Sequence, residues 1–141
     1  MDDPASPVLV CFLQSAAIDD LTALYKDAGW WDEACEQHPE FLDHVVQNSA
    51  LFAGAFYEKK MIGMGRALSD LVSDAYIQDI TVLQQYRGRG IGKKIIEKLI
   101  LGLRDHGVDW IGLIAEPGTG SFYENMGFTK LTGHIPYRLK D

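Results

Sequence analysis

The residues with the clearest chemical potential lie between positions 87 and 94, where glycines alternate with cationic side chains. Gly88, Gly90 and Gly92 carry no side chains, so the backbone N–H groups around them are unshielded. A strongly helical pattern begins at Ile91, and the positive end of its dipole would point back at those amides. The turn also carries four cations, at Arg87, Arg89, Lys93 and Lys94. This combination predicts a binding site for a phosphate-rich ligand.

The spacing within this turn excludes two common phosphate-binding loops. A P-loop needs a glycine five residues before its Gly-Lys pair and a serine or threonine after the lysine, but Arg87 and Lys94 hold those positions. A dinucleotide-binding loop needs G-x-G-x-x-G, and its third glycine is missing whether the motif is read from Gly88 or from Gly90. Without a ligand, the same residues would form a glycine-rich strand-to-helix turn with solvated basic side chains.

Hydrophobic periodicity predicts the elements that position this turn. A strand from Tyr76 to Val82 precedes it, and the longest helix, from Ile91 to Arg104, follows it. The other expected strands are Val8–Leu13, Leu51–Tyr57, Met61–Leu68, Trp110–Ala115, Phe128–Leu131 and Tyr137–Leu139. The other expected helices are Ile18–Ala28, Pro39–Val46 and Ser121–Met126. The order β-α-α-β-β-β-α-β-α-β-β predicts one α/β (α+β) domain over residues 1–141, with a mixed sheet and helices on both faces.

Two motifs and this element order resemble one family. Arg87, Gly90 and Gly92 match Q/R-x-x-G-x-G/A, which is similar to the acetyl-CoA pyrophosphate loop of the GNAT superfamily of N-acetyltransferases. The segment Ser121–Phe128 resembles the F-Y-E-x-x-G-F motif that closes the cofactor site in that family. The resemblance implies a mostly antiparallel central sheet. It also implies transfer of an acetyl group from acetyl-CoA to a primary amine, by direct attack in a ternary complex.

The resemblance also assigns roles to individual residues. It implies that the pyrophosphate binds the turn, at Arg87, Gly88, Arg89, Gly90, Ile91, Gly92 and Lys93. It implies that a bulged strand splays from its neighbour and offers backbone groups to the acetyl group and pantetheine, at Ile80, Thr81, Val82 and Leu83. The Val82 amide is the expected donor to the thioester carbonyl. Tyr123 would protonate the departing thiolate; alternatively, its ring packs in the core beside Phe122 and Phe128.

Asp79 is the only acid inside the strand from Tyr76 to Val82. A carboxylate flanked by apolar residues is costly unless it is paired. If functional, Asp79 would remove a proton from the substrate ammonium or bind it electrostatically, since an amine with a pKa near 10.4 is unreactive until deprotonated. Alternatively, Asp79 pairs with a structural partner. The sequence leaves both readings open.

The substrate side is expected to include the loop after the first helix. Trp30 and Trp31 stand beside two acids there, a combination that suits an amine; alternatively, the indoles seal the edge of the core. Glu116 occupies a position where the family often has an asparagine that contacts the cofactor. A carboxylate would repel phosphates, so we expect Glu116 to face the substrate instead.

Composition narrows the remaining possibilities. The net charge of −7 argues against nucleic-acid binding and is compatible with cationic substrates. The four histidines are scattered, and Cys11 and Cys35 have no metal-ligand or redox spacing, so no metal site is expected. Met1–Pro4 is acidic and Val8–Leu13 is too short for a signal sequence or membrane span, so we expect a cytoplasmic protein that does not bind membranes. A homodimer is compatible with these features. A small-molecule amine is the favoured acceptor; the alternatives are a protein or peptide acceptor, or a non-catalytic acyl-CoA-binding module.

Overall fold

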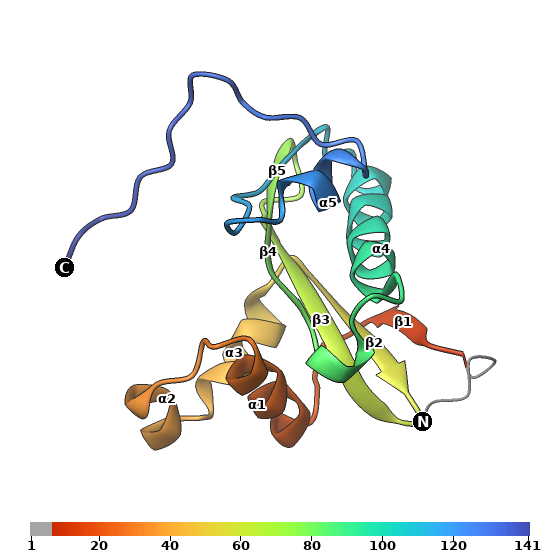
Figure 1. Ribbon diagram of the computed structural model, residues 1–141, viewed down its shortest axis with the longest axis vertical. Helices are drawn as coiled ribbons and strands as arrows, with labels where there is room; N and C mark the ends of the chain where they lie inside the picture. Colours follow the sequence, from red (N-terminus) through yellow and green to blue (C-terminus); the bar gives the residue numbers. More distant parts are fainter. Residues whose placement is uncertain (1–6) are drawn as a thin grey trace.

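A five-stranded sheet forms the centre of the computed structural model, which describes residues 7–141 (Figure 1). Its strands are β1 (Leu9–Phe12), β2 (Leu51–Tyr57), β3 (Lys60–Ser69), β4 (Asp74–Val82) and β5 (Trp110–Gly112). Strands β1 to β4 pair antiparallel in chain order, and β5 pairs parallel with β4. This mixed, mostly antiparallel sheet confirms the predicted fold class. The acidic segment Met1–Pro4 lies outside the described residues.

Helices cover both faces of the sheet, as predicted. Helices α1 (Ile18–Asp27), α2 (Glu33–Gln37) and α3 (Phe41–Asn48) lie on one side, and α4 (Ile91–Asp105) lies on the other (Figure 1). The short helix α5 (Gly120–Glu124) and a 3-10 turn, η1 (Gln84–Tyr86), complete the elements. Helix α2 was not predicted, although Asp32 is a typical N-cap residue whose carboxylate accepts the Cys35 N–H at 2.9 Å.

Helix α4 anchors the site to the core. Its buried face is the apolar stripe expected from the sequence, and each of these side chains is at most 3% exposed: Ile91, Ile95, Ile96, Leu99 and Leu103. The helix ends where Gly107 takes a φ of +90° and the Val108 N–H donates to the Leu103 carbonyl at 3.1 Å. A well-packed helix with a defined end holds its N-terminus in a fixed place beside β4.

A bulge in β4 changes which way its backbone faces. Arg66 pairs with Gln78, but Met64 pairs with Thr81, so Gly65 stands opposite both Asp79 and Ile80. Asp79 takes a φ of +55°, the left-handed conformation found at the first residue of a G1 bulge. Beyond this point, within residues 7–141, β4 has no strand on its other side, because β5 pairs only with residues 74–76. The predicted bulge and the predicted splaying are both present.

The C-terminal segment departs from the prediction. Residues 128–131 and 137–139, expected as strands, belong to no strand, and the expected strand at Trp110–Ala115 ends at Gly112. Every residue from 129 to 141 is exposed, and Figure 1 shows this segment running away from the body of the molecule. A strand needs a neighbouring strand for its backbone hydrogen bonds, and the described part of the chain supplies none along this path.

Candidate functional site

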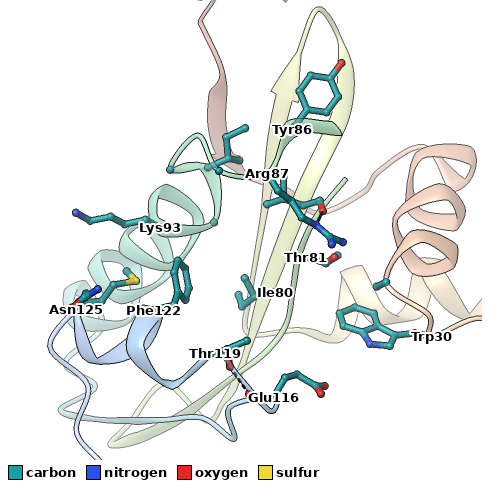
Figure 2. A pocket seen from close by; sticks show the side chains of 17 residues that line it. Trp30, Ile80, Thr81, Tyr86, Arg87, Lys93, Glu116, Thr119, Phe122 and Asn125 are labelled. Carbon is teal, nitrogen blue, oxygen red and sulfur yellow. Dashed lines mark hydrogen bonds between the residues drawn. The ribbon is translucent and has the colours of Figure 1, made fainter. Parts of the chain in front are cut away.

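A cleft of about 810 Å³ lies where the N-terminus of α4 meets the open part of β4. It brings together most of the predicted site residues, namely Trp30, Ile80, Thr81, Val82, Arg87, Gly88, Gly90, Ile91, Gly92, Lys93 and Glu116. Five predicted residues lie outside its lining, namely Trp31, Asp79, Leu83, Arg89 and Tyr123. Figure 2 shows Lys93 at one end of the cleft and Trp30 at the other, with Ile80 and Thr81 between them.

The N-terminus of α4 forms one end of the cleft. The first hydrogen bond of the helix runs from the Lys94 N–H to the Gly90 carbonyl at 3.1 Å, so the N–H groups of Ile91, Gly92 and Lys93 have no partner within the helix. Gly90 has a φ of +78°, and a Cβ there would meet nothing within 4 Å. The helix dipole adds a positive potential at these exposed amides, which makes this end a site for anions.

Val82 lines the cleft, and its backbone N–H faces away from β3. The Leu83 N–H donates to the Ile62 carbonyl of β3 at 2.8 Å. Because successive residues of a strand direct their backbone groups to opposite edges, Val82 directs its N–H away from β3, toward the side where β5 has diverged. This arrangement leaves a fixed donor within the cleft. It also means that the Leu83 amide is already bound within the sheet.

The cationic side chains of the turn differ in what they contact. Arg87 donates from Nε to the Val82 carbonyl at 2.8 Å and from Nη2 to Asp27 Oδ2 at 3.1 Å. It therefore ties the turn to β4 and to the end of α1. Arg89 donates to the Gln85 carbonyl at 3.2 Å. Lys93 lines the cleft, and its pairing with Glu97 at 3.8 Å is solvent-exposed and therefore weak.

Asp79 is engaged in an ion pair outside the cleft lining. Its Oδ2 accepts a hydrogen bond from Arg66 Nε at 2.7 Å and a longer one from the Tyr25 hydroxyl at 3.4 Å. Burial, followed by the charge of Asp79, raises the pKa of Tyr25 to about 12, so this phenol stays protonated at neutral pH. This geometry favours the structural reading of Asp79; its role as a base stays a prediction.

Tyr123 is half-buried in α5, next to the cleft-lining Phe122. Its ring packs edge-on against Phe122 and Phe128, with centroids 5.1 Å and 5.9 Å away. Burial, together with the negative charge of Glu116, raises the pKa of the Tyr123 phenol, so the hydroxyl keeps its proton at neutral pH. The Tyr123 ring therefore packs against two other aromatic rings, and its hydroxyl stays protonated and can donate a hydrogen bond.

The second end of the cleft combines an indole and a carboxylate. Trp30 packs edge-on against Tyr25, with centroids 5.5 Å apart, and also lines the cleft. Figure 2 shows the Glu116 side chain extending toward the side of the cleft where Trp30 lies. Trp31 turns elsewhere: its Nε1 donates to Glu36 at 2.6 Å, and Lys26 lies over its ring. The two adjacent tryptophans therefore have different environments.

Sequence reasoning did not single out six further residues that line the cleft, namely Ala28, Tyr86, Thr119, Phe122, Asn125 and Met126. Four of them come from α5 and its flanks, which lie in or beside the motif at Ser121–Phe128. The motif could have indicated them, because one short helix presents several side chains to the same surface.

Within residues 7–141, no group of three or more His, Cys, Asp or Glu side chains is placed to hold a metal ion. Over the same residues, no helix combines the length and the apolar character needed to cross a membrane.

Comparisons with known proteins agree with this geometry. The model of the acetyltransferase (GNAT) family matches residues 15–128. An uncharacterised ycf52-like N-acetyltransferase from Prochlorococcus marinus is 31% identical over 124 residues, covering 84% of this chain and 67% of that protein. A chloroplastic GCN5-related N-acetyltransferase from Arabidopsis thaliana is 44% identical over 71 residues, covering 50% of this chain and 28% of that protein.

The fold also matches solved structures. The crystal structure of a probable acetyltransferase from Staphylococcus aureus is 24% identical, with a TM-score of 0.79 over 96% of this chain and 100% of that one. This chain spans only 28% to 67% of the length of the two curated relatives named above. The family match nevertheless covers most of the sequence, including the turn, the bulged strand and α5. The chain belongs to the acetyltransferase (GNAT) family.

Proposed function

We propose that this protein transfers the acetyl group of acetyl-CoA to a primary amine, by direct attack within a ternary complex. The observation that carries the proposal is the cleft itself, which places the free N-terminus of α4 and the outward Val82 N–H along one surface. The N-terminus of α4 suits the phosphates of CoA, and the Val82 N–H suits a thioester carbonyl.

The residues at the α4 end fit a pyrophosphate. The amides of Ile91, Gly92 and Lys93, which have no partner within the helix, would donate to its oxygens, and the Lys93 ammonium would add charge. A Cβ on Gly92 would lie 3.5 Å from the Phe122 ring, so glycine keeps the gap between α4 and α5 open. Arg87 would act mainly by holding the turn in place through Asp27 and Val82.

Further along the cleft, the chain supplies groups suited to the acyl transfer. The Val82 N–H would polarise the acetyl carbonyl, where negative charge develops as the amine attacks. Tyr123 would donate its proton to the departing sulfur, since a phenol whose pKa is raised by burial and by Glu116 holds that proton at neutral pH. We assign Glu116 to the substrate amine, as a partner for the ammonium or as the acceptor of its proton, because Asp79 is already bound to Arg66.

A small amine is the acceptor class we favour, because Trp30 and Glu116 offer one aromatic face and one charge. The relatives' names point in two directions. A soybean relative, 44% identical over 71 residues, is named a histone acetyltransferase. A rice relative, 37% identical over 67 residues, is named a serotonin N-acetyltransferase. The acceptor panel should therefore include arylalkylamines, polyamines and lysine-containing peptides.

The first test measures CoA affinity by calorimetry in wild type and in Gly90→Val. Valine is strained at the φ of +78° and would disturb the amides that follow, so affinity should fall at least about tenfold. Gly107→Val is the matched control: Gly107 has a φ of +90° and equally open surroundings, but it lies at the other end of α4. Equal affinity in wild type and Gly90→Val would contradict the proposed cofactor site.

The second test measures thiol release from acetyl-CoA with each amine in the panel. Amine-dependent release with formation of the N-acetyl product would support the enzyme. Tight CoA binding without turnover on any member would instead indicate an acyl-CoA-binding module.

A further inference from the structure

Asp27, the last residue of α1, contacts the segment that follows β4. Its Oδ2 accepts two hydrogen bonds, from the Gln84 N–H at 3.2 Å and from Arg87 Nη2 at 3.1 Å. Gln84 is the first residue of η1, and Arg87 directly follows its last residue. One carboxylate oxygen therefore holds both ends of the short turn that joins β4 to the glycine-rich turn before α4.

The carboxylate of Asp27 does little for the stability of α1 or of the whole fold. The C-terminus of a helix carries the negative end of its dipole, so an acid in the last turn is repelled there, whereas the neighbouring Lys26 is favoured. The ion pair between Asp27 and Arg87 is also partly exposed, at 27% and 51%, and such pairs contribute little to stability. The main effect of Asp27 is therefore on the position of the segment that it contacts.

Arg87 extends this contact to the proposed carbonyl donor. Its Nε donates to the Val82 carbonyl at 2.8 Å. A residue in a strand directs its N–H and its C=O to the same edge, so this carbonyl lies on the open edge of β4 together with the Val82 N–H. Arg87 thus supplies the hydrogen bond that a neighbouring strand would give to this carbonyl, and Asp27 holds Arg87 in place.

The same end of α1 also carries the opposite wall of the cleft. The Trp30 N–H donates to the Tyr25 carbonyl at 2.9 Å, which fixes the indole to the last turn of α1. Ala28 and Trp30 both line the cleft. Figure 2 shows the Arg87 guanidinium pointing from the glycine-rich turn toward the side of the cleft where Trp30 lies. Asp27 therefore joins the wall that carries Trp30 to the open part of β4.

We propose that Asp27 is a positioning residue for acyl transfer, because it sets where the Val82 N–H lies relative to Trp30. The proposal rests on the proposed acetyl transfer, since it concerns the same cleft. Two bound reactants must lie in a near-attack geometry, and a displacement of about 1 Å can cost about 10²-fold in rate. CoA affinity, in contrast, depends on the amides at the start of α4, and Asp27 does not line the cleft.

The first test compares wild type with Asp27→Ala on the best amine of the panel. We expect kcat to fall about tenfold or more, while the Kd of CoA changes by less than about threefold and Tm stays close to that of wild type. Asp27→Asn keeps an oxygen for the Gln84 N–H but no charge for Arg87, so its kcat should lie between the two. Asp19→Ala is the matched control, because it removes an exposed acid from the other end of α1 and should keep the kcat of wild type.

The second test uses NMR and needs no acceptor amine. The Gln84 N–H should exchange with solvent about tenfold or more faster in Asp27→Ala, because it loses its acceptor. The Leu83 N–H, which donates to the Ile62 carbonyl, should keep its protection. Acetyl-CoA should shift the Val82 amide signal in wild type and shift it less in Asp27→Ala. A wild type that acetylates no amine would contradict the proposed transfer, and these signals would still test Asp27.

Each contrary result has a distinct meaning. Unchanged Gln84 exchange in Asp27→Ala would show that the contact does not exist in solution. Faster exchange with an unchanged kcat, or with an unchanged Val82 shift, would show that the contact positions nothing. A higher CoA affinity at the kcat of wild type would mean that Asp27 only withholds Arg87 from the phosphates. A parallel fall in kcat, CoA affinity and Tm would make the role of Asp27 structural. Any of these results would overturn the proposal.

Discussion

Replacing Asp79 with asparagine is expected to reduce stability far more than it changes the acid–base chemistry. The Asp79 carboxylate accepts from Arg66 Nε at 2.7 Å, and the two side chains are only 27% and 18% exposed. Asparagine has a similar shape but no charge, so the Arg66 guanidinium would lose its ionic partner in a partly desolvated place.

The magnitude follows from this intermediate burial. Exposed ion pairs contribute about 0.2–1 kcal/mol, whereas removing one partner of a fully buried pair costs about 3–5 kcal/mol. We therefore expect Asp79→Asn to lower the free energy of unfolding by about 2 kcal/mol. For a domain of this size that corresponds to a fall in Tm of about 5–10 °C.

The assay is thermal unfolding of wild type, Asp79→Asn, Arg66→Met and the double variant. The double-mutant cycle should give a coupling of about 1–2 kcal/mol between the two positions. The pH dependence of kcat/KM is then measured below the lowest Tm, and its shape should stay that of wild type. An Asp79→Asn protein with unchanged Tm and a kcat/KM that falls mainly at low pH would refute this reasoning and make Asp79 the base.

Three further outcomes are expected. Tyr123→Phe should lower kcat by about 10²–10⁴-fold with CoA affinity nearly unchanged, as rapid-quench kinetics and calorimetry would show; an unchanged single-turnover rate would leave Tyr123 a packing residue. Glu116→Gln removes the charge that helps raise the pKa of Tyr123, so the alkaline fall of kcat should move to lower pH and the KM for the amine should rise. The pKa of Tyr25 is about 12 in the folded protein and about 10 in the unfolded chain. This difference contributes about 2–3 kcal/mol to the free energy of unfolding, which is fully present below pH 10 and is lost as the pH rises through 12. Urea unfolding in that range should be less pH-dependent in Tyr25→Phe.

Local patterns predicted most of the fold. The turn at positions 87–92 and the helix after it depend on residues close together in the sequence, and both lie where expected. The expected strands at Leu51–Tyr57 and Met61–Leu68 are also close in sequence, and they pair as β2 and β3, with Tyr57 opposite Lys60. In contrast, the strand expected at Tyr137–Leu139 needs a neighbour to form, and no local pattern specifies where that neighbour lies.

The sequence predicted many of the residues that line the candidate site, but not the residues that they contact. Arg87 was expected at the phosphates, yet it contacts Asp27, a residue 60 positions away that no local pattern connects to it. Trp30 and Trp31 are adjacent in sequence, yet only Trp30 lines the cleft. Tertiary packing determines these contacts, and no local pattern in a single sequence indicates them.

The bulge at Asp79 changes which residues of β4 direct their backbone groups toward β3. Before it, the pairing of Arg66 with Gln78 directs even-numbered residues toward β3; after it, the bond from Leu83 to Ile62 shows that odd-numbered residues have taken that place. The pairings on either side show that the bulge places one extra residue opposite Gly65 without changing the partners of Gln78 and Thr81. Deleting position 79 would therefore leave Thr81 opposite Met64 and the Val82 N–H directed outward, but it would remove the bend of the bulge and the ion pair with Arg66. Asparagine or glycine at position 79 would lose the ion pair with Arg66 but keep the positive φ, whereas valine or isoleucine would also strain the backbone. The outward Val82 N–H therefore requires that the extra residue stay within the bulge, because a regular strand with the same residues would turn that N–H toward β3.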